Sequence, residues 1–318
     1  MKNTENRFER HPKLTLAAVV GVISLAILIL AELGLRIMYG LGDPVLYQSS
    51  PLYGYRLQPN QLVHRFHGAE IRVNNLGLRA DRDWDTTRTN KILFLGNSVT
   101  YGGSYIGTTE LFSHLAVQGL EGYLGGNAGV NGWGVENIHA LVVDDDFTPA
   151  SIYVSVLQEM DFYRGLSKLS GKPFWSTKPV FALQELLYHF YLNQFEKMYE
   201  GHDQFVTGRE NEKAVERGVR QLKEMDDYLK SRGYVHVIYM STNIHELVEG
   251  QPVDSLVYGL LKKYGIQFIS IRSRPEAASL PVEKQRELFY DWNHLSTAGH
   301  EVWASIIKDD LRKLLKRE

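Results

Sequence analysis

The chain has 318 residues, of which 44% are hydrophobic and 23% are charged, and these proportions are typical of a folded globular protein. Its 35 Lys and Arg residues nearly balance 37 Asp and Glu residues, so the formal net charge is -2. This balance provides no global field to attract nucleic acid or anionic lipid. The sequence has no cysteine, which excludes disulfides, thiolate metal sites and a cysteine nucleophile. We therefore expect one large domain with an appendage and no nucleic-acid partner.

The N-terminal segment is predicted to anchor the chain in a membrane. Residues 14–38 are almost wholly apolar, and about 20 such residues span the hydrocarbon core of a bilayer. Glu32 and Arg36 nearly cancel at the end of this segment. The residues that precede it are basic, namely Lys2, Arg7, Arg10 and Lys13. The positive-inside rule then places residues 1–13 in the cytoplasm and everything after Tyr39 on the extracytoplasmic side of the inner membrane.

Two other interpretations fit this segment less well. A cleaved signal peptide also has a basic start and an apolar stretch, but this run is long for a signal core and no small-x-small cleavage site follows it. A buried helix of a soluble domain would show a polar face, which residues 14–30 lack. An uncleaved single-pass anchor is therefore expected.

A β-rich preface and linker are expected over residues 39–90. The run 40–44 breaks the helix with two glycines and a proline. Strand-like pieces then follow at 53–57, 62–66 and 71–73, and the polar stretch 81–90 leads into the main domain.

From Lys91 the pattern changes to strands that alternate with helices. Residues 92–95 form a continuous apolar run, which is typical of a strand buried on both faces of a parallel sheet. Further strands are expected at 123–127, 151–157, 235–239 and 266–271, and helices at 110–119, 135–143, 211–231, 254–264 and 297–316. The alternation predicts a three-layer α/β/α sandwich with a parallel sheet over residues 91–318.

One segment, about residues 162–208, interrupts this alternation and is predicted to be a helical insertion. It is rich in aromatic residues, namely Phe174, Trp175, Phe181, Tyr188, Phe190, Tyr191, Phe195 and Tyr199. Because buried rings contribute a large packing area, we expect these side chains to pack against the main domain rather than to form a substrate surface.

Ser98 is the candidate nucleophile. It lies in GNSVTYG, residues 96–102, directly after the first buried strand, where α/β sheets place their ligand crevice. A serine at the opening of a helix lies beside free N–H groups that stabilise negative charge, but it can equally well serve only as the cap of that helix. A phosphate-binding loop is excluded because no Gly-Lys-Ser/Thr follows. The Gly-x-Ser-x-Gly elbow fails because Thr100 stands in place of its last glycine.

A nucleophilic serine needs a base, and the base needs an orienting carboxylate. Asp291 and His294 lie three residues apart before the C-terminal helix, so one turn can direct both toward one crevice. His300 competes as the base, but its place within that helix indicates an ordinary structural residue. We expect no cofactor and no metal, because His64 and His67 are only two histidines in the preface.

Together these motifs resemble those of the SGNH or GDSL hydrolases. That family has Gly-Asp-Ser-x-Thr-x-Gly after its first strand, similar to residues 96–102, and Asp-x-x-His near its C-terminus, similar to residues 291–294. Its second motif, Asn-x-Gly-x-x-Gly, matches NAGVNG at residues 127–132. The resemblance implies a flavodoxin-like fold, a triad of Ser98, His294 and Asp291, and oxyanion donors at Ser98 and Gly132.

The preface also resembles a segment of envelope members of this family. Residues 54–60 match Gly-Tyr-x-Leu-x-Pro-Asn, and residues 75–79 match Asn-x-Leu-Gly-x-Arg with altered spacing. The resemblance implies that the preface packs beside the sheet, with Arg79 as a candidate to reach the crevice.

Two positions depart from the family pattern. Asn97 replaces the usual aspartate before the serine, which removes a charge and keeps an oxygen acceptor. Met160 stands where the third motif has its oxyanion asparagine. Loss of one oxyanion donor costs about 10²–10³ in turnover, or about 2.7–4 kcal/mol, and Gln158 and Asn131 are the candidate substitutes.

The outward topology and the resemblance together imply a serine esterase or an O-acyl (acetyl) transferase that acts on an acylated envelope or exported polysaccharide. Two alternatives stay open. One is a catalytically impaired domain that binds glycan or scaffolds an envelope complex. The other is a lipase or thioesterase with an apolar crevice. The oligomeric state is left open.

Overall fold

A parallel sheet of five strands forms the centre of this computed structural model, which describes residues 10–169, 174–199 and 209–316. The strands stand in the order β6-β5-β7-β8-β9, which is the 2-1-3-4-5 order of flavodoxin-like folds. The predicted fold class is therefore confirmed. The strands are β5 (Lys91–Gly96), β6 (Leu124–Asn127), β7 (Ile152–Leu157), β8 (Val235–Met240) and β9 (Ile269–Ser270).

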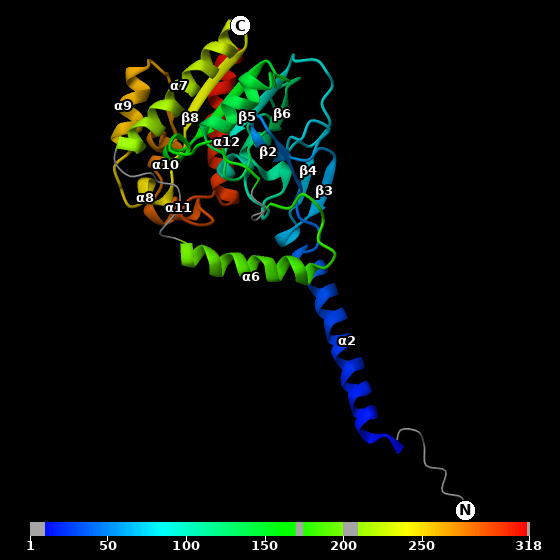
Figure 1. Ribbon diagram of the computed structural model, residues 1–318. Coiled ribbons are helices and arrows are strands. Elements are labelled where there is room, and N and C mark those ends of the chain that lie inside the picture. Colours follow the sequence, from blue (N-terminus) through cyan, green and yellow to red (C-terminus); the bar gives the residue numbers. More distant parts are fainter. Residues whose placement is uncertain (1–9, 170–173, 200–208, 317–318) are drawn as a thin grey trace, which may run out of the picture.

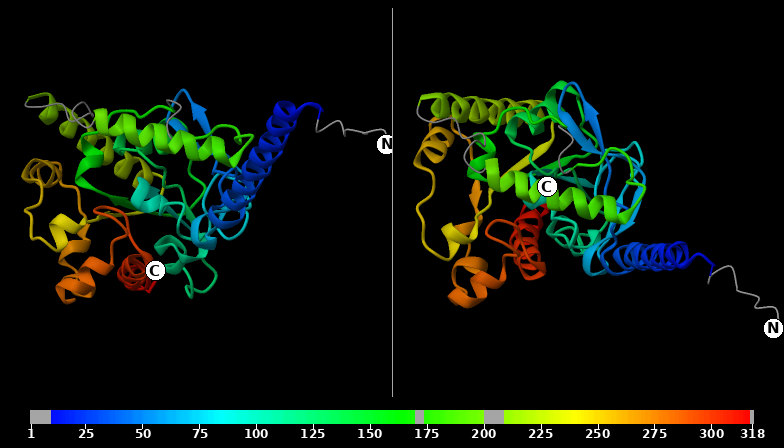
Figure 2. Two further views of the ribbon diagram at one scale, coloured as in Figure 1. Left: turned by 90° about the horizontal axis from the view of Figure 1, so that it is seen from below. Right: turned by 60° about the horizontal axis from the view of Figure 1, so that its bottom comes forward.

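Helices cover both faces of the sheet (Figures 1 and 2). In β5, Leu93 and Leu95 pack with α5, α7 and α9, whereas Ile92 and Phe94 point to the opposite face and pack with α4 and α12. Side chains alternate along a strand, so a strand covered on both sides must be apolar at every position. The helices of this domain are α3 (Ser98–Tyr101), α4 (Phe112–Leu115), α5 (Val135–His139), α7 (Arg209–Ser231), α8 (Ile244–Leu247), α9 (Ser255–Lys263), α10 (Pro275–Ala278), α11 (Val282–Glu287) and α12 (Thr297–Leu315).

The β-rich preface extends the edge of the sheet. Its four strands form two antiparallel hairpins. The first of the four strands was not predicted from the sequence. After these hairpins the main chain of Arg79 pairs with that of Asn127 in the edge strand β6. The N···O distances of the two hydrogen bonds are 2.9 and 3.1 Å. Tyr55 and Leu57 belong to the same hydrophobic core as β5 and β7. The strands are β1 (Tyr47–Ser50), β2 (Gly54–Leu57), β3 (Gln61–His64) and β4 (Glu70–Val73).

Two helices lie outside these layers. The first, α2 (Pro12–Tyr39), has 28 residues. Its most apolar stretch has a mean hydropathy of 2.8 and is not buried in the protein. The helix is therefore long and apolar enough to cross a membrane. The second, α6 (Ala182–Tyr199), belongs to the predicted insertion. In Figure 1, α6 runs across the base of the body, crosswise to α2. Residues 170–173 and 200–208 of the insertion lie outside the described residues.

The aromatic residues of the insertion divide between the core and the surface. Phe174 stacks on Tyr55 with ring centroids 5.2 Å apart, and Trp175 meets Tyr188 at 5.1 Å. Three other rings are more than half exposed, namely Phe181, Phe190 and Tyr191. The expectation that these rings pack against the main domain is therefore wrong for the outer side of α6. The side chains of Phe195 and Tyr199 lie outside the described part of the chain.

Arg79 is buried and organises the loop that follows α3. Its Nη1 donates to the carbonyl oxygens of Tyr101 and Gly103 at 2.6 and 2.8 Å, and its Nη2 donates to that of Ile106 at 2.6 Å. Its guanidinium carbon lies 4.8 Å from the ring centroid of Tyr101. Arg79 thus holds the loop beside Ser98 in place, and its charge is directed at these three carbonyls.

We expect Arg79→Lys to lower the free energy of unfolding by about 2–4 kcal/mol, because an ammonium lacks the planar fork that serves three carbonyls and each buried carbonyl left unpaired costs about 1–3 kcal/mol. Chemical unfolding of the full chain in detergent, followed by circular dichroism, measures the change. The matched control is Arg82→Lys, since Arg82 is exposed and pairs with Asp81 at 2.9 Å, and such pairs contribute about 0–1 kcal/mol. Equal losses for both variants would contradict the proposed role of Arg79.

Candidate active site

The structure brings Ser98, His294 and Asp291 together at the carboxyl edge of the sheet. Ser98 begins α3 directly beyond β5, and the other two residues lie in the loop between α11 and α12. His294 Nε2 is 2.8 Å from Ser98 Oγ, and His294 Nδ1 is 2.7 Å from Asp291 Oδ2. A serine, an imidazole and a carboxylate therefore form one hydrogen-bonded chain, with the spacing that nucleophilic catalysis requires.

Asp291 is held as a carboxylate. Its Oδ1 accepts hydrogen bonds from the N–H groups of Asn293 and His294 at 2.8 and 2.7 Å. Burial raises the pKa of Asp291, but its hydrogen bonds to His294 and Asn293 outweigh burial and lower the pKa to about 2. An ionised Asp291 favours the His294 tautomer that carries its proton on Nδ1, which leaves Nε2 able to accept the proton of Ser98.

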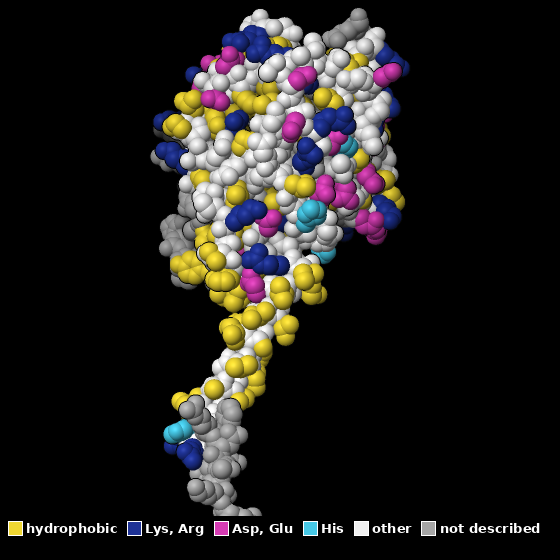
Figure 3. All heavy atoms as spheres, turned by 90° about the vertical axis from the view of Figure 1, so that its right-hand side faces the viewer, with side chains coloured by type: hydrophobic (Ala, Val, Ile, Leu, Met, Phe, Trp, Pro, Cys, Tyr) yellow, Lys and Arg dark blue, Asp and Glu magenta, His cyan; other side chains and the backbone are white. Residues whose placement is uncertain are grey.

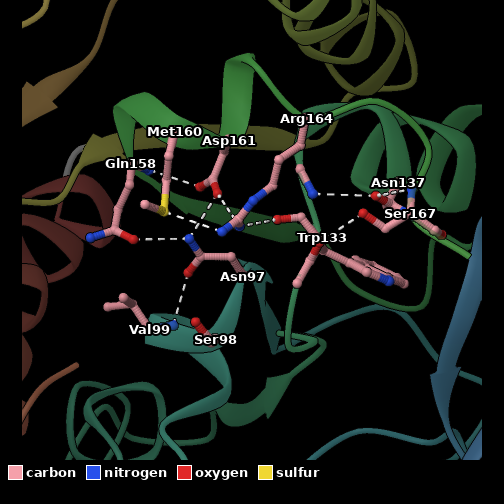
Figure 4. Close-up of polar contacts among 12 residues, drawn as sticks. Asn97, Ser98, Val99, Trp133, Asn137, Gln158, Met160, Asp161, Arg164 and Ser167 are labelled. Carbon is pink, nitrogen blue, oxygen red and sulfur yellow. Dashed lines mark hydrogen bonds and ion pairs between the residues drawn. The ribbon is translucent and has the colours of Figure 1, made fainter. Parts of the chain in front are cut away.

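Asn97 links the turn before Ser98 to the loop after β7 (Figure 4). Its Oδ1 accepts from the N–H of Val99 at 2.8 Å and so caps α3. Its Nδ2 donates to Gln158 Oε1 at 3.0 Å and to Asp161 Oδ1 at 2.8 Å. Asn97 keeps the oxygen acceptor of the usual aspartate and adds two hydrogen bonds that a carboxylate cannot donate.

Arg164 is part of this network and was missed in the sequence. Its Nη1 donates to the carbonyl oxygen of Trp133 at 2.9 Å and to Asp161 Oδ1 at 3.2 Å, and its Nη2 lies 3.2 Å from the sulfur of Met160. Burial raises the pKa of Asp161 to about 6, although Arg164 acts to lower it. Arg164 thereby ties the loop after β7 to the loop of Gly132. The available signal was the i,i+3 spacing of Asp161 and Arg164 beside the third motif.

Met160 offers no hydrogen-bond donor at the position of the family asparagine, and its sulfur contacts Arg164. The two candidate substitutes already have partners. Gln158 Nε2 donates to Asn293 Oδ1 at 2.5 Å, and Asn131 Nδ2 donates to the hydroxyl of Tyr47 at 3.0 Å. Each amide NH₂ keeps a second proton, so each of the two side chains can still donate one more hydrogen bond.

The second motif places Gly132 in a conformation that favours glycine, with φ at 76°. A Cβ atom at this position would lie 2.9 Å from the hydroxyl oxygen of Tyr55. The Gly132 carbonyl accepts from Ser167 Oγ at 2.8 Å. Among the residues that the structure describes, the backbone N–H groups of Ser98 and Gly132 donate to no acceptor. Both N–H groups thus remain open to a ligand oxygen.

His300, the competing candidate base, lies in the hydrophobic core. It is fully buried in α12, where its Nδ1 accepts from the N–H of Phe112 at 3.2 Å and its ring stacks on the Phe112 ring at 5.6 Å between centroids. Burial lowers the pKa of His300 to about 3. The imidazole is therefore a neutral part of the core, as expected of an ordinary helix residue.

A polar cavity of about 380 Å³ adjoins the triad. Two of its lining residues connect it to the site: Asn293 lies between Asp291 and His294 in the chain, and Gln158 accepts a hydrogen bond from Asn97. Burial raises the pKa of Glu159, which faces this cavity, to about 7. Amide and carboxyl groups line most of the cavity, namely Gln158, Glu159, Asn211, Asn243, Glu246 and Asn293. Such a lining suits a ligand with several hydroxyl groups better than a hydrocarbon chain.

Of the two preface histidines, His64 faces Glu70, with His64 Nε2 and Glu70 Oε2 3.4 Å apart. Within the described ranges, no three His, Asp or Glu side chains are grouped as ligands for a metal ion.

Comparison with known proteins identifies no matching family model and no matching curated protein. Solved structures do match. A member of the lipolytic G-D-S-L family from Veillonella parvula is 14% identical, with 68% of this chain and 94% of that chain covered and a TM-score of 0.39. The acetyl xylan esterase AlAXEase is 14% identical, with 70% and 99% covered and a TM-score of 0.44. An acetylxylan esterase from Geobacillus stearothermophilus is 17% identical, with 69% and 92% covered and a TM-score of 0.39. The similar structures thus include the family that the motifs resemble, but likenesses this weak assign no activity to this chain.

Asn97→Asp, which restores the usual family residue, is expected to lower the free energy of unfolding by about 1–3 kcal/mol at pH 8, because the new carboxylate faces two acceptors, Asp161 Oδ1 and Gln158 Oε1. Two adjacent carboxylates hold one proton more tightly than either alone. A pKa that is raised in the folded state makes stability fall as the pH rises through it, and the pKa of Asp161 is already about 6. The loss should therefore be smaller at pH 5 than at pH 8.

Urea unfolding at the two pH values measures this difference. Gln251→Glu is the control, because it also replaces an amide by a carboxylate, at an exposed position, and such surface changes stay within about 0.5 kcal/mol. A loss for Asn97→Asp that does not depend on pH would contradict the shared proton.

Proposed function

We propose that this protein is a membrane-anchored serine esterase or O-acyl transferase with Ser98 as its nucleophile. The hydrogen-bonded chain from Ser98 through His294 to Asp291 supports this most strongly. The alternative role for Ser98, as a helix cap, is filled by Asn97, whose side chain accepts the N–H of Val99. The position of Ser98 is therefore better explained by chemistry than by capping.

In the proposed mechanism, Ser98 Oγ attacks the carbonyl carbon of an ester while His294 Nε2 takes its proton. Asp291 stabilises the resulting imidazolium. The negative charge on the tetrahedral intermediate is bound by the N–H groups of Ser98 and Gly132. His294 then gives the proton to the leaving alcohol as the C–O bond breaks, which leaves an acyl-serine. Water or a sugar hydroxyl attacks this ester in the same way and releases Ser98.

The oxyanion hole of this proposal lacks the side-chain donor of the family, because Met160 cannot supply one. The second amide protons of Gln158 and Asn131 are the candidate replacements. Without either, turnover would be about 10²–10³ lower than with an asparagine at this position.

For the substrate, we propose an acylated polysaccharide of the cell envelope or an exported one. The polar cavity beside the triad supports a carrier rich in hydroxyl groups, and the basic residues before α2 support an extracytoplasmic position. A lipase or thioesterase would instead require an apolar crevice beside Ser98. The choice between hydrolysis and transfer depends on whether water or a sugar hydroxyl reaches the acyl-serine.

Ser98→Ala in the full chain is expected to reduce hydrolysis of p-nitrophenyl acetate by about 10³-fold or more, because the acyl-serine cannot form. The matched control is Ser273→Ala, since Ser273 is an exposed residue of the short 3₁₀ helix Ile271–Ser273, outside the site, and this change should leave activity unchanged. Unchanged activity in Ser98→Ala would refute the nucleophile. A folded wild-type protein that is inactive on every acyl donor would favour a glycan-binding domain.

Acetyl esters are expected to be cleaved with a higher kcat/KM than octanoyl esters of the same alcohol, because the cavity offers hydrogen-bonding groups rather than apolar surface. Steady-state kinetics on the two p-nitrophenyl esters measures the ratio. A preference for octanoate would support the lipase or thioesterase alternative.

We further propose that residues 1–13 lie in the cytoplasm and that the main domain lies outside the inner membrane. An alkaline phosphatase fused after residue 318 should then be active in intact cells, because that enzyme matures only outside the cytoplasm, where disulfides form. A cytoplasmic reporter such as β-galactosidase at the same position is the control and should be inactive. The reverse pattern would overturn the topology.

A further inference from the structure

The outer side of α6 is apolar, although it faces away from the body. Leu187, Phe190 and Tyr191 are 59%, 62% and 56% exposed, and their spacing of three and four residues places them on one side of the helix. Val180 and Phe181, just before α6, are also exposed, at 72% and 58%. We call these five residues the α6 apolar face. Exposed apolar groups that gather in one place mark an interaction surface.

The start of α6 is tied to α2 by hydrogen bonds. The carboxylate of Glu32 accepts from the N–H groups of Ala182 and Leu183 at 2.8 and 3.1 Å. Arg36 Nη2 donates to the carbonyl oxygen of Val180 at 3.1 Å. Glu32 thus satisfies two of the free N–H groups in the first turn of α6, and it fixes where that helix begins along α2.

Glu32 is also the first charged residue after the apolar run of α2. At a rise of about 1.5 Å per residue, the uncharged residues 14–31 extend over about 27 Å, which is close to the thickness of about 30 Å of the hydrocarbon core. Glu32 therefore lies at the level where hydrocarbon gives way to the polar interface. Because α6 starts at this level and runs crosswise to α2 (Figure 1), it stays close to that level along its length. Figure 3 shows hydrophobic side chains gathered at the base of the body, where α2 leaves it.

The inner side of α6 sets the rotation of the helix about its own axis. Glu185 is fully buried and forms an ion pair with Arg65, with Oε1 and Nη2 2.5 Å apart. Glu185 Oε2 also accepts from the N–H of Gly42 at 2.6 Å. Because a buried charge must keep these partners, α6 cannot turn its apolar face toward the body.

We propose that the α6 apolar face lies in the lipid headgroup region beside α2, and so holds the catalytic edge of the sheet toward the membrane surface. Aromatic and large apolar side chains on a helix in the plane of the membrane are typical of such contacts. In Figure 1, α8 and the start of α12 lie on the same side of the body as α6, whereas the C-terminus lies at the opposite end. The contact with lipid is continuous with the membrane span of α2, which favours lipid over a second copy of the chain.

Spin labelling tests this placement, because the natural chain has no cysteine and each single-cysteine variant carries one label. The full chain is labelled at Phe190→Cys, at Leu187→Cys or at the control Lys313→Cys, whose native side chain is 67% exposed near the C-terminus. The variants are reconstituted in vesicles of phosphatidylcholine and phosphatidylglycerol. Collision rates with oxygen, which enters lipid, and with a water-soluble nickel chelate are then compared.

The ratio of oxygen to nickel collisions is expected to be several-fold higher at positions 187 and 190 than at position 313. Equal ratios at the three positions would overturn the proposal, since they would place the face in water. Dipolar broadening between labels at position 190 in vesicles with excess lipid would also overturn it, because a second copy of the chain would then cover this face. The result does not depend on the esterase proposal, because no activity is measured.

Discussion

The buried carboxylate of Asp161 is the constraint on which the candidate site depends. A buried charge is tolerated only where hydrogen bonds and opposite charge replace water. Asp161 receives hydrogen bonds from Asn97, from Arg164 and from the N–H of Gln158, the last at 2.8 Å. These donors come from two different loops at the carboxyl edge of the sheet, so satisfying one carboxylate also sets how those loops lie relative to each other.

The effect of this carboxylate extends to both halves of the site. Through Arg164 it reaches the carbonyl of Trp133, next to Gly132, and so it supports the side where an oxyanion would bind. Through Asn97 it reaches Gln158, whose amide in turn holds Asn293 in the loop of the triad histidine. The positions of Ser98, of the free N–H groups and of the imidazole are therefore coupled through polar contacts in a region of low dielectric.

The topology of the sheet explains why these loops meet. In the order β6-β5-β7, the chain runs from β5 to one side and then crosses to the other, so the loops after these strands diverge at β5. Such a switch point leaves a crevice at the carboxyl ends of the strands. Ser98 follows β5, Gly132 follows β6 and Asp161 follows β7. The junction of α2 and α6 fixes the orientation of this same edge relative to α2, the helix that we propose spans the membrane.

Local patterns in the sequence determined the long apolar helix α2, the buried strands β5 and β7, the long helices α7 and α12, and the choice of Ser98, Asp291 and His294 as candidate site residues. These features depend on runs of neighbouring residues or on short motifs, and their physical cause is contained within the segment itself. The tertiary structure alone decided the roles of Arg79 and Arg164, the two donations of Asn97, the shortness of β9 and the outward direction of the α6 rings. Each of these features depends on which backbone carbonyl, buried charge or neighbouring helix the fold places next to the residue or segment concerned. Such partners are distant in the chain, so no local pattern encodes them.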